Sequence, residues 1–118
     1  MKIRVKRIYE EALPADGCRV LVDRLWPRGI KKESAGLDAW EKELAPSSAL
    51  RTWYGHRPER WEEFREKYRK ELSENPRVES FLGEHKKNET VTLLYASREE
   101  KRNQAVVLRE FLEKKLDT

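Results

Sequence analysis

Two short apolar segments constrain the fold of this chain more than any other feature. The segment TVTLLYA at residues 90–96 is β-branched and apolar on both faces, and CRVLVD at residues 18–23 is mostly apolar. Strands of this kind lie inside a sheet, where other elements cover them. We therefore expect both segments to be buried strands, with residues 90–96 at the centre of the sheet.

Much of the remaining chain has apolar residues three and four positions apart, which is the spacing of amphipathic helices. Helices are expected to begin near residues 38, 47, 58, 76 and 97. In the helix from Pro58, the spacing predicts a buried face formed by Trp61, Phe64, Tyr68 and Leu72. Asp38 with Glu41, and Ser97 with Glu100, resemble capping boxes at two of these positions. The order of strand, helices, strand and helix predicts an α/β domain in which residues 18–23 and 90–96 lie parallel.

The first segment, residues 2–8, alternates charged and apolar residues, which is typical of an edge strand with one face in water. The link at residues 9–17 has no helical pattern, whereas a parallel crossover usually needs about a dozen residues or more. We therefore expect this edge strand to pair antiparallel with residues 18–23. The predicted fold is a small α/β sheet with a central parallel pair, an antiparallel edge strand and helices packed on it.

Length and cysteine content limit the classes of protein that fit. The 118 residues suit a single domain over residues 1–118. With Cys18 as its one cysteine the chain has no internal disulfide and no tetrahedral zinc set, and we expect neither a metal nor a cofactor. The N-terminal sequence MKIRVKRIYEE lacks the apolar run of a signal peptide or membrane span. We expect a cytoplasmic protein with no membrane partner.

The charge pattern does not favour nucleic-acid binding. The net charge is +4, but 26 basic residues are mixed with 22 acidic ones. Pairs such as Glu63 with Lys67 stand four residues apart, as neighbours on a helix surface do. Most of this charge is therefore expected on a solvated surface, and no basic block or binding motif accompanies it.

The residues that follow the two buried strands are the first candidates for a site, because ligands of open α/β sheets bind beyond the carboxyl ends of strands. A surface turn has no packing need for two arginines and a tryptophan, so Arg24, Trp26 and Arg28 are predicted ligand-binding residues. Asp23 is a candidate general base, although the adjacent Arg24 is expected to lower its pKa. The alternative is that Trp26 closes the core and Arg24 pairs with Asp23.

The segment WYGHRP at residues 53–58 is the second candidate. The helix expected from Pro58 lacks a capping side chain, so its free N–H groups, together with His56, Arg57 and the nearby Arg51, are predicted to bind an anion. His56 is also a candidate catalytic residue, because imidazole titrates near neutral pH. The alternative is that water satisfies these groups and His56 packs under Trp53.

The strong catalytic motifs are absent: no nucleophile elbow, phosphate-binding glycine loop, dinucleotide fingerprint or zinc-protease helix occurs. Capping explains Ser47 and Ser97 more simply than catalysis does. Ser97 is kept as a candidate ligand-binding residue because it directly follows the strand at residues 90–96.

Several motifs together resemble a known family. LVDRLWPRG, DAWEKELAPSSALRTWYGHRPERWEEFREKY and VTLLYASREEKRNQAVVL are similar to the YeaO-like branch of the bacterial and archaeal domain of unknown function 488, over nearly the whole chain. The resemblance implies an α/β fold without implying an activity, and it adds Asn103 to the candidate ligand-binding residues. Gln104 stands where the family pattern leads us to expect histidine, so a histidine role in the last helix is not carried over.

The leading hypothesis is a small enzyme or binding domain for an anionic compound that carries a phosphate or carboxylate group. Arginine suits this role because its planar guanidinium grips two oxygens at once. The alternative is a regulatory module that binds nucleic acid or protein without catalysis.

Overall fold

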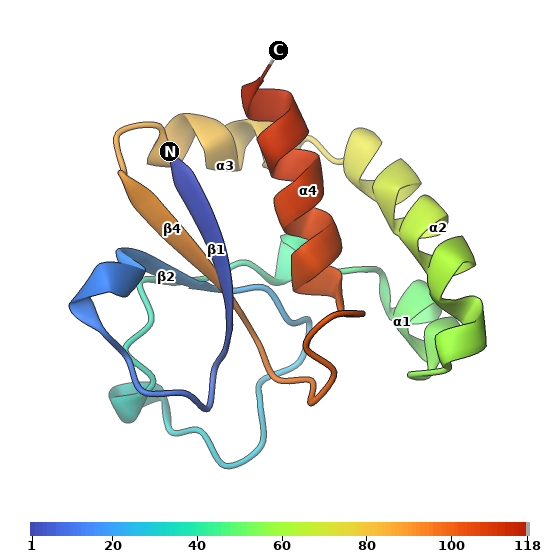
Figure 1. The fold of residues 1–118 in the computed structure, drawn as a ribbon, viewed down its shortest axis with the longest axis horizontal. Helices are drawn as coiled ribbons and strands as arrows, with labels where there is room; N and C mark the ends of the chain where they lie inside the picture. The colour runs from blue at the N-terminus through green and yellow to red at the C-terminus, as the bar shows by residue number, and fades with distance from the viewer. Residues whose placement is uncertain (118) are drawn as a thin grey trace.

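The computed structural model describes residues 1–117 and contains one sheet of four parallel strands in the order β1-β4-β2-β3 (Figure 1). The strands are β1 (Lys2–Arg7), β2 (Cys18–Leu21), β3 (Ala39–Trp40) and β4 (Thr90–Tyr95). The two buried strands predicted from sequence, β2 and β4, are adjacent and parallel. Leu93 and Leu94 of β4, whose side chains point to opposite faces, are both fully buried.

β1 is an edge strand as predicted, but its predicted antiparallel pairing with β2 is wrong. It pairs parallel with β4, with Lys2 opposite Thr90, and does not touch β2 in the sheet. The link between β1 and β2 crosses β4 with a single 3-10 turn, Pro14–Asp16, and no α-helix. The Thr92 hydroxyl donates a 2.6 Å hydrogen bond to the Asp16 carbonyl there. Gly17, with φ +64°, lies so close that an added Cβ would be 2.4 Å from the Thr90 oxygen. The crossover therefore fits into few residues because it lies directly on the sheet.

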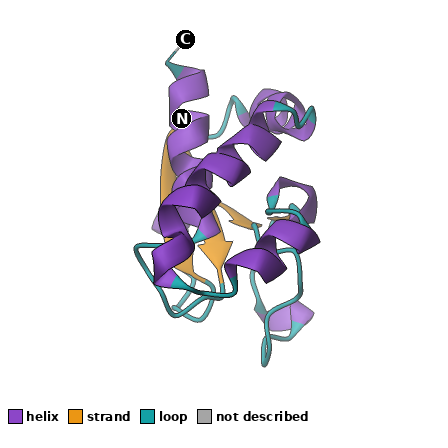
Figure 2. Ribbon diagram, turned by 90° about the vertical axis from the view of Figure 1, so that its right-hand side faces the viewer, coloured by secondary structure: helices purple, strands orange, loops and turns teal. Residues whose placement is uncertain are grey.

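Four α-helices complete the fold: α1 (Ser48–Tyr54), α2 (Trp61–Ser73), α3 (Arg77–His85) and α4 (Gln104–Leu116). Figure 2 looks from the side of α1 and α2 and shows these helices in front of the strands. All four helices place side chains in one core with β-strand residues such as Val20, Val91 and Leu93. Among them, Phe64, Tyr68 and Leu72 of α2 are buried as predicted from their spacing, while Trp61 is half-buried.

Loops rather than helices cover the other face of the sheet. Ile8, Leu21 and Leu94 are buried there beneath the partly buried indoles of Trp26 and Trp40 and neighbouring loop side chains. The chain from residue 22 to residue 38 therefore acts as a second covering layer, and it is also the chain that leads away from the end of β2.

Two predicted helix starts are wrong. The region near residue 38 forms the short strand β3 and a 3-10 turn, Lys42–Leu44, because the Asp38 carboxylate accepts the Arg19 N–H at 2.8 Å instead of capping a helix. α4 begins seven residues later than expected from Ser97, at Gln104, where the Asn103 side chain accepts the Val106 N–H at 3.1 Å. Within residues 1–117, no helix is both long enough and apolar enough to cross a bilayer.

Candidate functional site

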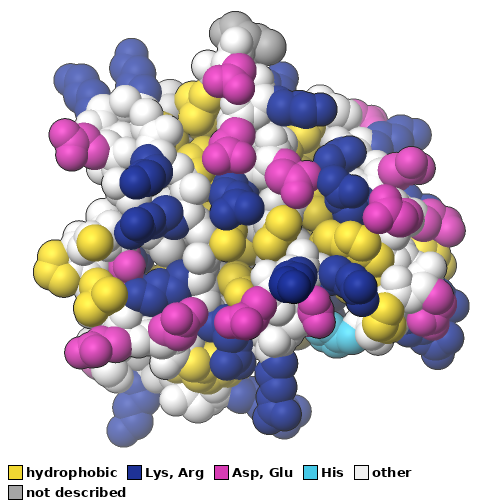
Figure 3. All heavy atoms as spheres, viewed as in Figure 1, with side chains coloured by type: hydrophobic (Ala, Val, Ile, Leu, Met, Phe, Trp, Pro, Cys, Tyr) yellow, Lys and Arg dark blue, Asp and Glu magenta, His cyan; other side chains and the backbone are white. Residues whose placement is uncertain are grey.

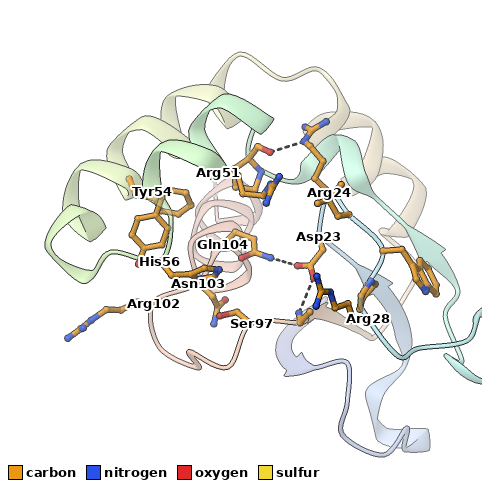
Figure 4. A pocket seen from close by; sticks show the side chains of 16 residues that line it. Asp23, Arg24, Arg28, Arg51, Tyr54, His56, Ser97, Arg102, Asn103 and Gln104 are labelled. Atoms are coloured by element: carbon orange, nitrogen blue, oxygen red, sulfur yellow. Dashed lines mark hydrogen bonds between the residues drawn. The ribbon is translucent and has the colours of Figure 1, made fainter.

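A cavity of about 550 Å³ opens beyond the carboxyl ends of β2 and β4 (Figure 4). Its walls come mainly from the turn after β2, from α1 and the residues after it, from the loop after β4, and from the start of α4. The predicted site residues that line it are Asp23, Arg24, Trp26, Arg28, Arg51, His56, Ser97 and Asn103. The fold thus brings together residues that are far apart in the sequence, and their functional roles stay predictions.

Asp23 lies in the interior of this cavity and is the one acidic residue among the described residues that line it. One carboxylate oxygen accepts the Ala96 N–H at 3.0 Å, and the other accepts a hydrogen bond from the Gln104 side-chain amide. Burial raises the pKa of Asp23 to about 6, although both hydrogen bonds act to lower it. Asp23 is therefore an acidic group that titrates not far below neutral pH.

The pairing of Arg24 with Asp23, given above as the alternative to ligand binding, does not occur. The Arg24 guanidinium instead donates to the Pro46 carbonyl at 2.9 Å and to the Ala45 carbonyl at 3.3 Å. The sequence-based expectation that Arg24 lowers the Asp23 pKa is therefore wrong. Arg24 joins the turn after β2 to the chain that enters α1.

Arg28, Arg51 and Arg102 line the same cavity with exposed side chains. Within residues 1–117, none of their guanidinium groups makes a hydrogen bond or an ion pair. In Figure 4, Arg51 and Arg28 lie on either side of Asp23. The outer part of the cavity therefore carries three guanidinium groups that form no ion pair with a described carboxylate.

His56 has an unusual backbone for its position beside α1. It has φ +56°, and it follows Gly55, which ends α1 in the left-handed conformation. Left-handed backbone is uncommon for residues other than glycine, and histidine is among those that adopt it more readily. His56 is exposed and lies 6.3 Å from the Tyr54 ring, measured between ring centroids. The turn thus directs the imidazole to the cavity.

Arg57 does not line the cavity, although it is next to His56. The chain beyond it forms a 3-10 turn, Pro58–Arg60, before α2, and no side chain caps α2. The helix that begins at the cavity is α4, through Asn103 and Gln104. The helix that begins at the candidate site is therefore α4, which Asn103 caps, and not the helix expected at Pro58.

Trp26, Ser97 and Asn103 line the cavity and also make contacts that hold its walls. The Trp26 indole donates to the Ile30 carbonyl at 2.7 Å, and Asn103 uses its amide both to cap α4 and to bind the Glu99 carbonyl. The Ser97 hydroxyl accepts the Glu99 N–H at 3.1 Å. These hydrogen bonds hold the walls of the cavity in place. Trp26 also packs against Trp40 over the face of the sheet that loops cover, which agrees with the alternative that it closes part of the core.

Sequence reasoning missed three polar lining residues: Tyr54, Arg102 and Gln104. Gln104 was considered only as a departure from the family pattern, yet its amide binds Asp23. Its position at the start of the helix that follows β4 was the available signal, since such helices begin at the strand ends. Among the described residues, no group of three or more His, Cys, Asp or Glu side chains is arranged to hold a metal ion.

Comparison with known proteins gives the family. The family model "Inactive DUF488-N3 subclade" matches residues 2–118. The chain is 42% identical over 112 residues to the "Uncharacterized protein YeaO" of Escherichia coli (strain K12), which covers 95% of this chain and 97% of that protein. It is 43% identical over 114 residues to "Uncharacterized protein Mb3100c" of Mycobacterium bovis and "Uncharacterized protein Rv3073c" of Mycobacterium tuberculosis, covering 94% of this chain and 93% of each relative. No solved structure shows a significant match. The resemblance in its motifs is thus confirmed, and the chain belongs to the domain of unknown function 488 family as a YeaO-like member.

Proposed function

We propose that the cavity at the ends of β2 and β4 binds a small anionic compound with a phosphate or carboxylate group. One observation carries this proposal: Arg28, Arg51 and Arg102 surround a cavity of about 550 Å³ and have no acidic partner among the described residues. Pockets for small molecules usually have volumes of about 300–1,000 Å³.

Other arginines of this chain show what an acidic neighbour does. Arg65 and Arg69 both bind Glu110, and Arg77 binds Glu41 at 2.6 Å. The chain has 22 acidic residues, but among the described residues the half-buried Asp23 is the one carboxylate that lines the cavity. The positive charge at its mouth is therefore available to a ligand from outside.

Binding is favoured over catalysis by two observations. The matching family model carries the description "inactive", and both oxygens of Asp23 already accept hydrogen bonds from the protein. The pKa of about 6 at Asp23 supports proton transfer as a second candidate function. Phosphorus NMR of a phosphate ester mixed with the protein tests this second function. Conversion of the ester by the wild-type protein, but not by Asp23→Asn, would favour catalysis.

The surface charge gives the nucleic-acid alternative little support. Figure 3 shows basic and acidic side chains interspersed over the face that carries α4 and α2, without a continuous basic surface. Nucleic-acid binding would require several phosphate contacts along such a surface. Absence of DNA binding even at low salt concentration, where phosphate contacts are strongest, would remove this alternative.

Thermal unfolding with phosphate, pyrophosphate and citrate tests the proposal, because a ligand that binds only the folded state raises the melting temperature. Arg28→Ala and Arg51→Ala should each remove about 1.5–3 kcal/mol of binding free energy, the usual contribution of a charge-assisted hydrogen bond. Arg57→Ala is the matched control, since this exposed arginine lies next to His56 but outside the cavity.

The proposal is contradicted if none of the three anions raises the melting temperature of the wild-type protein. It is contradicted equally if Arg57→Ala weakens binding as much as Arg28→Ala and Arg51→Ala do, because binding would then follow the overall charge and not the cavity.

A further inference from the structure

The cavity separates two kinds of polar group by depth. The cationic side chains Arg28, Arg51 and Arg102 are exposed and form its mouth, whereas Asp23 and Gln104 are half-buried and lie farther in. The mouth offers hydrogen-bond donors that carry positive charge. The interior offers a carboxylate, which accepts hydrogen bonds only, beside a side-chain amide.

The two interior groups have acceptor capacity that the protein leaves unused. Each Asp23 oxygen accepts one hydrogen bond from the protein, while a carboxylate oxygen has room for about two. The Gln104 amide points its nitrogen at Asp23, and its oxygen has no hydrogen-bond partner among residues 1–117. A ligand that fills the interior must therefore supply hydrogen-bond donors.

Bare phosphate does not satisfy this arrangement. An anion placed against Asp23 would meet a carboxylate and an acceptor oxygen, and it would be too small to fill about 550 Å³. An ammonium group would suit Asp23 but would be repelled by the surrounding arginines. Neutral hydroxyl groups meet both conditions, because they donate to Asp23 and Gln104 without adding charge.

We propose that the ligand of this cavity is an anionic polyol, with its hydroxyl groups on Asp23 and Gln104 and its terminal phosphate or carboxylate between Arg28 and Arg51. This inference rests on the proposed function and names the class of compound bound. A sugar phosphate and a sugar acid share the required chemistry and differ only in the anionic group.

Isothermal titration calorimetry of the wild-type protein with inorganic phosphate, ribose, ribose 5-phosphate and gluconate tests the inference. At about pH 7.5, where Asp23 is mostly ionised, ribose 5-phosphate should bind at least about tenfold more tightly than phosphate, as one or two added hydrogen bonds predict. Ribose should bind more weakly than either. A tighter complex with gluconate than with ribose 5-phosphate would identify the sugar-acid form of the proposal.

Two variants locate the selectivity. Asp23→Asn and Gln104→Met should each reduce the preference for ribose 5-phosphate over phosphate by about fivefold or more, because each changes an interior acceptor. The affinity for inorganic phosphate should be unchanged or higher in Asp23→Asn, since the substitution removes a carboxylate that repels phosphate. Gln104→Met keeps a chain of similar size and provides the test if Asp23→Asn does not fold. Arg57→Ala should leave the preference unchanged.

The failures of the two proposals are distinguishable. If phosphate, ribose 5-phosphate and gluconate bind equally well and Arg28→Ala weakens all three, the cavity binds anions and the polyol inference is wrong. If no compound binds, the proposed function fails as well. A preference for ribose 5-phosphate that persists in both Asp23→Asn and Gln104→Met would overturn the assigned position of the hydroxyl groups.

Discussion

Asp16 and Asp23 are the two largely enclosed aspartates of this domain, and their surroundings have opposite effects. Asp16 is 3% exposed, binds Arg19 at 2.5 Å and Lys6 at 3.1 Å, and accepts the Leu13 N–H. Burial opposes its ionisation, but these hydrogen bonds outweigh burial and lower its pKa. Around Asp23, Arg24 turns away to backbone carbonyls, and burial raises the pKa to about 6.

The arginines near the two aspartates differ in the same way: Arg19 is bound within the protein, whereas the side chains of Arg28 and Arg51 have no partner among the described residues. The Arg19 guanidinium is 7% exposed in its side chain and binds Asp16, the Gly36 carbonyl and the Ala35 carbonyl. Those bonds fix the loops that cover the helix-free face of the sheet. The guanidinium groups of Arg28 and Arg51 have no partner within the described chain, so they are available to the proposed ligand.

Arg19→Ala should have the largest effect. The substitution leaves Asp16 buried with only Lys6 as a cationic partner and frees two loop carbonyls, so the free energy of unfolding should fall by about 3–5 kcal/mol. Urea denaturation measures it. A loss as small as that of a surface substitution would mean that the ion pairs of Asp16 do not stabilise the fold. Asp16 and Asp23 would then not differ in their contribution to stability.

Asp23→Asn should change stability in a pH-dependent way. Since the folded-state pKa of Asp23 is raised from 3.8 to about 6, the folded protein keeps a proton there that the unfolded chain releases, and wild-type stability falls as pH rises through this window. The variant lacks this titration, so it should gain about 2–3 kcal/mol relative to wild type between about pH 4 and pH 7.

Urea denaturation at several pH values measures the stability difference between Asp23→Asn and wild type. Asp16→Asn is the variant for comparison, because the Asp16 pKa is shifted in the opposite direction. The Asp16 pKa is lowered, so its carboxylate stabilises the fold above the unfolded-state pKa and this contribution is lost as pH falls. Asp16→Asn should therefore be most damaging near neutral pH. Parallel pH profiles for the two variants would show that the two aspartates do not differ as described.

Arg24→Ala should cost about 1–3 kcal/mol of stability, because the buried Ala45 and Pro46 carbonyls lose a charged donor. Thermal and urea unfolding measure the loss. Arg24→Lys should restore only part of it, since a lysine cannot reproduce the planar two-donor geometry. An unchanged stability in Arg24→Ala would move Arg24 from the structural group to the ligand-binding group.

Arg28→Ala and Arg51→Ala should have the smallest effect on the unliganded protein, within about 0.5 kcal/mol, because neither side chain has a partner in the described chain. The same urea titrations measure it, and Arg57→Ala gives the baseline for an exposed arginine. A loss above about 2 kcal/mol would show that these arginines are structural like Arg19.

Local patterns predicted the elements that local forces determine. The apolar segments became β2 and β4, and the spacing of Phe64, Tyr68 and Leu72 placed them inward on α2. The candidate residues after both strands do line one cavity, since parallel strands end at the same edge of a sheet. Predictions failed where a distant partner competed with a local one, as when Asp38 bound the Arg19 N–H instead of capping a helix.

The sequence by itself determined an α/β domain with two buried strands, amphipathic helices and a cluster of arginines after the second strand. Only the tertiary structure decided that β1 pairs parallel with β4, and which arginine is available to a ligand. Arg24 and Arg28 are four positions apart in one turn, but Pro46 offers its carbonyl to Arg24 from 22 residues away. Spacing along the chain fixes which face a residue occupies, whereas hydrogen-bond partners and burial depend on segments that only folding brings together.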